Sequence, residues 1–540
     1  MKKQTFLQGS LLLTISAVFA KLCGAMFKLP LTAILGGTGM GYFSCAYGLF
    51  LPVYAVLVTG LSTAVARPVA DFTARMQYRS AFKIRHTARL LCLGMGLAGM
   101  GISLLCAKFF TLRTSGSPEA YPAVLVMTPA IVFCCLTAVE RGYYEGLCNM
   151  TPTAVSQAIE AMIKLIAGLF LCKLFLNSDF IILKNYTSES RGAFGAVLGI
   201  TLSTAGGWFY FIIQNKIQKE KPDSQELPPS SGMIIKLLFK IMIPAALGAL
   251  VTNLTSLIDL FTMMRSFSAM LISDPEGFYQ KADLSVSVPR EEAAAFVYGS
   301  FMGLSVTVFN LVPSLTNMLA KSVLPCTAQA WSTGNRKQAA DYARQVLILT
   351  GLLAIPSGCG IFALSEGILK FLFSGRESEI QAAVSGLKYL SVGLIFLCLS
   401  FPVFSLLQAM GREDLPVKIM LPAILIKLIC NLFLIPRFCT SGAAISTGIC
   451  YGLILILALL CLRKELGESL NILRPLLCQL WGGFLCAGSA WLCYDRILCY
   501  FPQRIAFLIA VLIAVLIYLL ALFLISQKEI KMLFSRKQAV

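Results

Sequence analysis

The amino-acid sequence predicts an all-α polytopic membrane protein. Hydrophobic residues make up 57% of its 540 positions and charged residues only 13%, which is about half the share found in soluble domains. Apolar stretches of roughly 20 residues, the length that crosses a bilayer as a helix, recur along the whole chain. Counting these stretches gives about 14 transmembrane helices.

The first span follows Lys2 and Lys3, as the apolar core of a signal peptide does. Its apolar run continues to Pro30 without an A-x-A cleavage site, so we expect it to remain as a membrane helix. The expected limits of the spans are 8–30, 42–66, 89–112, 121–146, 151–176, 193–215, 237–264, 293–320, 343–364, 383–409, 415–436, 441–462, 475–499 and 503–526.

Basic residues gather in the connections that follow even-numbered spans, and this distribution predicts the orientation of the chain in the membrane. The connection after the second span is strongly basic, as is the end of the chain, whereas the connection 266–292 on the opposite side is acidic. Lysine and arginine are retained on the cytoplasmic side of bacterial membranes. Both termini are therefore expected in the cytoplasm. The net charge of +19 is interpreted as a topology signal, and no nucleic-acid partner is expected.

A charged and then Pro/Ser-rich stretch, 216–233, is the one clear linker. The halves that it separates look like weak repeats, because Pro152 precedes Lys164 much as Pro416 precedes Lys427. Two lobes around a central cavity are expected. The predicted divisions are an N-terminal lobe 1–220, a cytoplasmic linker 221–236, a C-terminal lobe 237–465, and two extra spans with a basic tail 466–540.

The first span carries Lys21 and Lys28 on one face, since seven residues make about two helical turns. A charge at the middle of a membrane helix costs about 3 kcal/mol, so it usually faces a bundle interior or a watery cavity. We therefore expect a cationic cavity within the membrane. The alternative is that Lys28 reaches the surface with its long side chain while Lys21 pairs with a neighbouring helix.

Further ionisable or polar candidates lie in later spans. Glu160 and Lys164 are spaced i, i+4, so they either neutralise one another or form a switchable pair beside a substrate path. Asp259 and Asn253 mark the seventh span; for Asp259, a partner lysine, a coupling-ion ligand and a protonatable carrier all remain open. Lys427 repeats the position of Lys164.

Several chemistries find no motif in the sequence. The 19 cysteines lie mostly in apolar runs without a CxxC pair, and His86 is the only histidine, so neither a metal site nor a disulfide framework is expected. No phosphate-binding P-loop or nucleophile elbow occurs. The glycine pattern at 94–99 lies inside an apolar helix, where small residues favour helix packing. We expect a protein that is not an enzyme and holds no cofactor.

Four segments resemble a known family. They are KLCGAMFKLPLTAILGGTGMGYFSCAY at 21–47, RGYYEGLCNMTPTAVSQAIEAMIK at 141–164, LIDLFTMMR at 257–265 and LLQAMGREDLPVKIMLPAILIKLICNLFLIP at 406–436. Together they resemble the polysaccharide-export branch of the multidrug/oligosaccharidyl-lipid/polysaccharide flippase superfamily, and especially its stage V sporulation protein B group. The resemblance implies two six-helix lobes related by a pseudo-twofold axis along the membrane normal, plus two extra helices.

The lipid II flippases are relatives of that group, and in them basic cavity residues are thought to meet the lipid's diphosphate. By position, the resemblance implies that role for Lys21, Lys28 and Arg67. The chain departs from the pattern twice. Its first helix lacks the Arg-Asp pair of the best-known lipid II flippases, and Met264-Arg265 stands where the sporulation group usually has two arginines.

The expected function is therefore the flipping of a polyprenyl-diphosphate-linked sugar, either lipid II or a polysaccharide precursor, across the bacterial cytoplasmic membrane by alternating access. A Na⁺ or H⁺ gradient or the membrane potential would drive it. Membrane lipids and cell-wall or polysaccharide polymerases are the expected partners, in cell-wall, spore-cortex or surface-polysaccharide synthesis. One alternative is an ion-coupled exporter of cationic drugs, for which Asp259 and Glu160 would supply the acidic residues. Another is a non-transporting scaffold for a sporulation or envelope complex, which would tolerate loss of the charges within the membrane.

Overall fold

The computed structural model describes residues 6–114, 116–177, 183–217, 228–284, 288–412, 414–467 and 473–525. Within these ranges the chain is helical and contains no strand. The first part of the predicted linker 221–236 and the basic C-terminal tail lie outside the described residues. The all-α polytopic fold predicted from the apolar runs is thus confirmed.

Contacts within the chain divide it into two compact units, Met1–Arg265 and Ser266–Val540. The division falls inside helix α7, later than the linker at which the sequence divides the chain, so the predicted domain limits stay a prediction. The helices of the first unit, the last of which continues into the second, are α1 Phe6–Leu57, α2 Leu61–Ala74, α3 Tyr78–Phe109, η1 Phe110–Thr114, η2 Pro118–Ala120, α4 Tyr121–Gly146, α5 Thr151–Leu176, α6 Ser188–Ile217 and α7 Ser231–Ser273.

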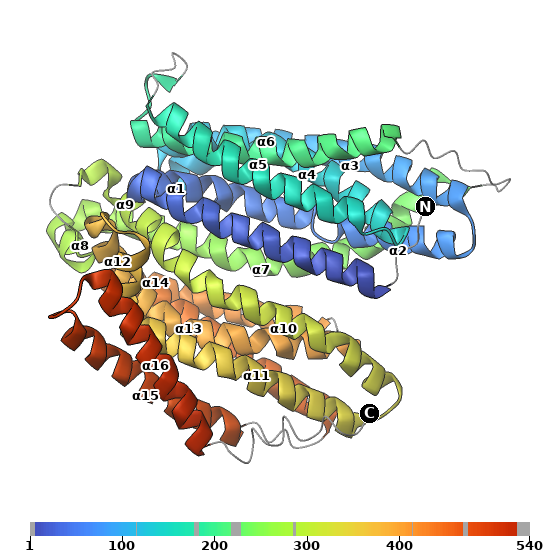
Figure 1. Ribbon diagram of the computed structural model, residues 1–540. Coiled ribbons are helices and arrows are strands. Elements are labelled where there is room, and N and C mark those ends of the chain that lie inside the picture. Colours follow the sequence, from blue (N-terminus) through green and yellow to red (C-terminus); the bar gives the residue numbers. More distant parts are fainter. Residues whose placement is uncertain are drawn as a thin grey trace. The chain divides into compact units, whose positions relative to one another are not determined.

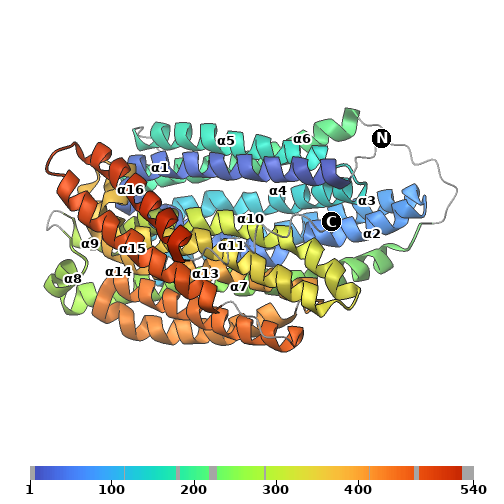
Figure 2. The same cartoon turned by 60° about the horizontal axis from the view of Figure 1, so that its bottom comes forward.

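The second unit is built in the same way, from long helices joined by short connections. Its helices are α8 Pro275–Lys281, α9 Arg290–Ser300, η4 Phe301–Ser305, α10 Val306–Ser332, α11 Arg336–Ala363, α12 Ser365–Leu372, α13 Glu377–Ala409, α14 Asp414–Leu466, α15 Leu473–Ile497 and α16 Gln503–Ile525. Among them α13 contacts α10, α11 and α14, while α15 pairs with α16, as both views show (Figures 1 and 2).

Local sequence explains several helix starts. Pro122 and Pro152 lie in the first turns of α4 and α5. Backbone N–H groups in the first turn have no partner within the helix, so the N–H that proline lacks costs no helical hydrogen bond there. Asn335 precedes α11, and its side-chain oxygen accepts a hydrogen bond from the Gln338 N–H at 3.1 Å.

Two helices are too long for one crossing. At 1.5 Å per residue, α1 with 52 residues and α14 with 53 would each extend about 80 Å, against a hydrocarbon layer of about 30 Å. Each contains one non-helical residue, Gly36 in α1 and Cys439 in α14, which separates two helical segments. Gly36 has φ 66° and ψ −172°, a conformation that essentially only glycine adopts.

Eleven of the helical stretches in the described residues are long and apolar enough to cross a membrane. Two of the eleven contain the double segments of α1 and α14, and α5 with 26 residues is also long enough to cross. The count of about 14 spans stays a prediction. The expected second span, 42–66, is interrupted: α1 ends at Leu57 and α2 begins at Leu61, after Gly60 with φ 83°.

In the first unit, close helix contacts depend on glycine. A side chain at Gly142 would collide with the Ser62 carbonyl oxygen, and one at Gly146 with the Ala66 carbonyl oxygen. The backbones of α4 and α2 therefore approach closely. Around this contact lies an apolar core drawn from α2, α3, α4, α6 and the first part of α7. Figure 1 shows α1, α5 and α6 running alongside one another in the same unit.

The two units repeat two packing details. In the first unit Gly195 lies against the Leu171 carbonyl, and in the second Gly442 lies against the Leu434 carbonyl in the same manner. One turn later the pair Gly199 and Gly168 of the first unit is replaced by a hydrogen bond from Ser446 to Asn431 in the second. The spacing that separates Leu171 from Leu434 also separates Lys164 from Lys427. The weak sequence repeat thus has a counterpart in helix packing.

Candidate functional site

A cluster of two lysines and two aromatic residues connects α1 with α5. The Nζ atom of Lys164 lies 3.4 Å from the Tyr47 hydroxyl oxygen. The same atom lies 5.3 Å from the ring centroid of Phe27 and 5.9 Å from that of Tyr47, within the range of cation–π attraction. Lys28 is close enough to Lys164 to interact with it electrostatically. We call Lys28, Lys164, Tyr47 and Phe27 the lysine cluster.

The sequence holds this cluster together through a glycine. Phe27 is only 2% exposed, and its ring fills the space beside Gly168, where a side chain would collide with it. Gly168 follows Lys164 by one turn, so the packing of Phe27 fixes α1 against α5 beside the lysine. Phe43 extends the aromatic contact, with its ring centroid 5.0 Å from that of Tyr47.

The cluster has a defined chemical preference. Lys28 and Lys164 are both half-buried, and two like charges in a poorly solvated site repel one another. An anion with two or more negative charges removes this repulsion and accepts charge-assisted hydrogen bonds from both ammonium groups. The Tyr47 hydroxyl adds a neutral donor. The arrangement suits a diphosphate better than a cation.

Glu160 makes a different contact from the one expected. Its Oε2 atom lies 2.7 Å from the Arg141 Nη2 atom of α4, and the Arg141 Nε atom donates to the Ser156 hydroxyl at 3.0 Å. The structure therefore pairs Glu160 with Arg141 and directs Lys164 to the aromatic residues of α1. The expected i, i+4 pair between Glu160 and Lys164 is wrong, because partners on neighbouring helices take both side chains.

The other predicted site residues are spread more widely. Lys21 on α1 and Arg67 on α2 are exposed, and Asn253 and Asp259 on α7 are half-buried. Lys427, on α14 of the second unit, is only 2% exposed. Of the eight predicted residues, the structure brings Lys28 together with Lys164. It does not bring Glu160 into that cluster.

Sequence reasoning missed a buried ionic network in the first unit. Arg85 of α3 donates from Nε and Nη2 to Glu140 Oε2 of α4, at 3.1 and 2.5 Å. Glu140 also bonds to Arg89, and Asn215 of α6 contacts both Arg85 and Glu140. Glu140 is 1% and Arg85 5% exposed. We call Arg85, Arg89, Glu140 and Asn215 the buried network.

This network corrects two interpretations of the sequence. The expected spans leave Arg85 in the basic connection between 66 and 89, and they place Glu140, with Arg141 and Glu145, near the cytoplasmic end of the span 121–146, where a solvated face is the simpler account. Instead α3 begins at Tyr78, so Arg85 lies within the helix, and its guanidinium is 4.2 Å from the Tyr143 ring centroid. Glu140 ends a run of α4, residues 121–139, that contains no charged residue, and this was the available signal, because buried carboxylates require a partner.

A model of one protein family, described as lipid II flippase MurJ, matches residues 83–534. The chain belongs to this family. The match covers most of the two units but begins after α2, so the assignment of Lys28 rests on the geometry of the lysine cluster. The family consists of transporters, which agrees with the expectation of a protein that is not an enzyme.

Proteins similar to this member of the MurJ family include two from Bacillus subtilis (strain 168). Lipid II flippase MurJ is 22% identical, with 86% of this chain and 84% of the relative covered. Stage V sporulation protein B is 21% identical, with 87% and 86% covered. The predicted resemblance to the sporulation group and to the lipid II flippases is thus confirmed.

Solved structures show the same fold. Lipid II flippase MurJ in an inward closed conformation matches with a TM-score of 0.69 and 16% identity, covering 96% of this chain and all of that one. An inward-facing multidrug resistance MATE family transporter matches with a TM-score of 0.64 and 15% identity, covering 82% and 94%. The chain is a multi-pass transporter of the MurJ family, and the MATE likeness concerns the fold alone.

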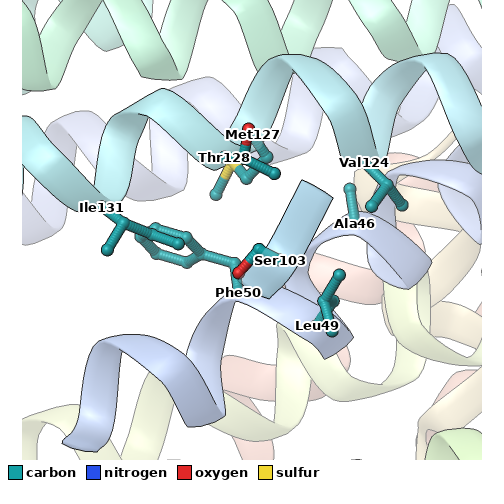
Figure 3. A pocket seen from close by; sticks show the side chains of 8 residues that line it. All are labelled: Ala46, Leu49, Phe50, Ser103, Val124, Met127, Thr128 and Ile131. Atoms are coloured by element: carbon teal, nitrogen blue, oxygen red, sulfur yellow. The ribbon is translucent and has the colours of Figure 1, made fainter. Parts of the chain in front are cut away.

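One small pocket of this MurJ-family chain lies between α1, α3 and α4 (Figure 3). Its lining includes Phe50, Ser103, Thr128 and Ile131, and its volume is about 10 Å³. That space admits no more than a single water molecule. It is too small for a lipid-linked sugar or a drug. In the described residues, no three His, Cys, Asp or Glu side chains gather as metal ligands would.

Proposed function

We propose that this member of the MurJ family flips a polyprenyl-diphosphate-linked sugar, lipid II or a polysaccharide precursor, across the bacterial cytoplasmic membrane by alternating access. The observation that carries the proposal is the lysine cluster. Two half-buried ammonium groups from α1 and α5, with the Tyr47 hydroxyl beside them, form a polyanion site within the membrane-spanning part of one unit.

The energetics favour such a substrate over a neutral one. Opposite charges about 4 Å apart interact by roughly 4 kcal/mol at an effective dielectric constant of 20, several times more than in water. A diphosphate offers two charged groups to two lysines, while the polyprenyl tail remains in the bilayer. The acidic residues Glu160 and Glu140 do not oppose this binding, because Arg141 and Arg85 pair with them.

The transport cycle needs a driving force and a biological setting. A Na⁺ or H⁺ gradient or the membrane potential would return the lobes after each crossing, since moving one charge through 100 mV is worth about 2.3 kcal/mol. The flipped lipid would supply cell-wall, spore-cortex or surface-polysaccharide polymerases. Both termini would lie in the cytoplasm, as the basic connections predict.

The binding test uses the purified full chain and three lipids: undecaprenyl diphosphate, lipid II and an undecaprenyl-diphosphate sugar. Lys28→Met/Lys164→Met should weaken binding of the diphosphate lipids more than tenfold, because methionine keeps the apolar stem but removes the charge. Lys173→Met, an exposed lysine on the same helix α5, is the matched control and should bind as the wild type does. Unchanged binding by the double variant would refute the assigned site.

The second candidate function is the ion-coupled export of cationic compounds. The MATE-like fold and the half-buried carboxylates Glu160 and Asp259 favour it. The pairing of Glu160 with Arg141 disfavours it, because a cationic drug would have to displace the guanidinium. Increased resistance of an expressing strain to cationic dyes, lost in Asp259→Asn, would support export of cations and contradict the flippase proposal.

A further inference from the structure

An open apolar groove lies between α13 and the second segment of α14, within the second unit. Its volume is about 450 Å³, which is in the range of sites that bind small ligands. Tyr389 and Phe396 of α13 and Ile449 of α14 are among its lining residues. In the described part of the chain the whole lining comes from these two helices, which lie side by side in both views (Figures 1 and 2). The groove is therefore separate from the extra helices α15 and α16.

Glycine residues make the groove possible. Gly448 and Gly452 are one turn apart on α14, and both line it. A side chain at Gly393 of α13 would lie 3.1 Å from the Gly448 Cα atom, so the two backbones approach closely there. Val392 of α13 and Ile449 of α14, which are 42% and 45% exposed, add apolar walls. The sequence thus builds an open apolar channel on the surface of the unit.

A lysine lies one turn from this wall. Lys388 precedes Val392 by four residues on α13, so both lie on the same face of the helix. The Lys388 side chain is exposed, and its Nζ atom is 5.1 Å from the ring centroid of Phe362. Among the residues that the structure describes, no carboxylate forms an ion pair with it. A lysine within a membrane helix is costly unless an anion or water balances its charge.

The position of Lys388 along α13 matches the headgroup level of one leaflet. With 33 residues α13 is about 50 Å long, which leaves about 10 Å beyond the hydrocarbon layer at each end of a centred helix. Lys388 is about 16 Å from Glu377, where the helix begins. From there a lysine side chain extends to the phosphate level while its stem stays in the hydrocarbon. With both termini in the cytoplasm, as proposed above, this is the outer leaflet.

We propose that this groove binds an anionic phospholipid, with an acyl chain between α13 and α14 and the phosphate on the Lys388 ammonium group. The Tyr389 hydroxyl, next to Lys388 in the chain and part of the lining, supplies a neutral donor at the same level. A second copy of the chain suits the groove less well. An interface between two copies would bring two lysines into a poorly solvated region without acids to balance them. The site is independent of the lipid that the protein transports.

The experiment reconstitutes the purified full chain in phosphatidylcholine nanodiscs that contain a photo-crosslinking phospholipid with a diazirine in its acyl chain. Phosphatidylglycerol and phosphatidylcholine probes with identical chains are compared at equal mole fraction, and labelled peptides are mapped by mass spectrometry. We expect the anionic probe to label 389–396 and 445–456 about fivefold more than the zwitterionic probe. Lys388→Met should lower this labelling to the zwitterionic level, because methionine keeps the stem but removes the charge.

A second variant fills the groove and leaves the lysine in place. Gly452→Leu should remove the labelling by the anionic probe. The added Cβ atom meets the Phe396 ring at 3.5 Å, an ordinary contact, so the variant should fold. Two changes on α3 are matched controls: Lys108→Met, at an exposed lysine, and Gly101→Leu, at a glycine without a neighbour within 4 Å. Both should be labelled as the wild type is.

The outcomes distinguish this lipid from other occupants of the groove. Equal labelling of the wild type by the two probes is the pattern of annular lipid and would overturn the proposal, as would wild-type labelling of Lys388→Met by the anionic probe. A wild-type dimer that Gly452→Leu converts into a monomer would assign the groove to a second copy instead. If Lys388→Met does not fold, as judged by its thermal unfolding, Gly452→Leu decides the matter. Lys28→Met/Lys164→Met should be labelled as the wild type is, which separates this site from the flippase proposal.

Discussion

The two units share packing details but differ in what they bury. Gly96 of α3 lies against Val132 of α4 in the first unit, and Gly358 of α11 lies against Ile395 of α13 in the second. The Gly96 contact matches the Gly358 contact, and the Gly195 contact matches the Gly442 contact. These matches align the sequences of the two units, so each position in one unit has an equivalent in the other. Where the first unit has Arg85, Glu140 and Asn215, the second has Leu347, Val403 and Leu462.

The three replacements in the second unit are apolar and at most 1% exposed. The cavities differ in the same sense. The first unit contains a polar cavity of about 270 Å³ with Arg141 in its lining, whereas the second has the apolar groove between α13 and α14. A shared helical scaffold therefore does not require shared chemistry. Apart from Lys388, the ionic chemistry described above is concentrated in the first unit.

At one pair of equivalent positions both units have a charged residue, lysine. Lys164 and Lys427 are equivalent by the same counting, yet Lys164 is half-buried beside Tyr47, whereas Lys427 is 2% exposed. Equivalent lysines thus differ in solvent exposure. The comparison leads to four predictions, of which the first concerns the strongest contrast.

Glu140→Val should destabilise the first unit by about 3–5 kcal/mol, because it leaves the buried Arg85 without its partner. An SDS unfolding titration of the purified chain measures the change. The triple variant Arg85→Leu/Glu140→Val/Asn215→Leu installs the residues of the second unit and should recover most of the loss, since well-packed apolar residues often replace buried ion pairs at little cost. Wild-type stability of the single variant would contradict the role given to the network.

Lys164→Met should weaken binding of undecaprenyl diphosphate about tenfold or more, whereas Lys427→Met should change it less than twofold. The physical reason is access: Lys427 is enclosed by its own unit, so we expect that no ligand reaches it. Isothermal binding measurements on both variants test the contrast. Equal losses in the two variants would show that the units contribute equally.

Gly199→Ala should destabilise the first unit by about 1–3 kcal/mol, because the added methyl group meets the backbone of Gly168. Gly94→Ala on α3 is the matched control, since no neighbour lies within 4 Å of the added atom. It should be neutral or slightly stabilising, as alanine favours helices over glycine. Thermal unfolding of both variants is the measurement. Unchanged stability of Gly199→Ala would contradict the close contact between α5 and α6.

Ser446→Ala should cost the second unit only about 1 kcal/mol, the usual value for one lost hydrogen bond. The Asn431 side chain keeps its remaining capacity for hydrogen bonds. Thermal unfolding measures this loss of stability and compares it with the loss in Gly199→Ala, the variant at the equivalent position in the first unit. A loss larger than that of Gly199→Ala would reverse the predicted order.

The sequence predicted the features that depend on composition and period. Long apolar runs predicted the helices, and the spacing of Pro152 and Lys164 relative to Pro416 and Lys427 indicated the repeat. Contacts between helices could not be predicted from the sequence. The i, i+4 rule paired Glu160 with Lys164, but spacing along one helix cannot show that Arg141 lies closer. Likewise, positive charge near a span end suggested a solvated connection, whereas Arg85 is buried because Glu140 and Asn215 face it.

The central claim is that the lysine cluster of the first unit binds a diphosphate lipid, which the protein then moves across the membrane by alternating access. The most direct measurement reconstitutes the purified chain in proteoliposomes and follows the transbilayer movement of a fluorescent undecaprenyl-diphosphate sugar, with a cationic dye as the comparison. The account predicts that the wild type moves the lipid and not the dye, that Lys28→Met/Lys164→Met moves neither, and that Lys427→Met still moves the lipid. Dye transport without lipid movement, or full lipid movement by the double variant, would contradict it.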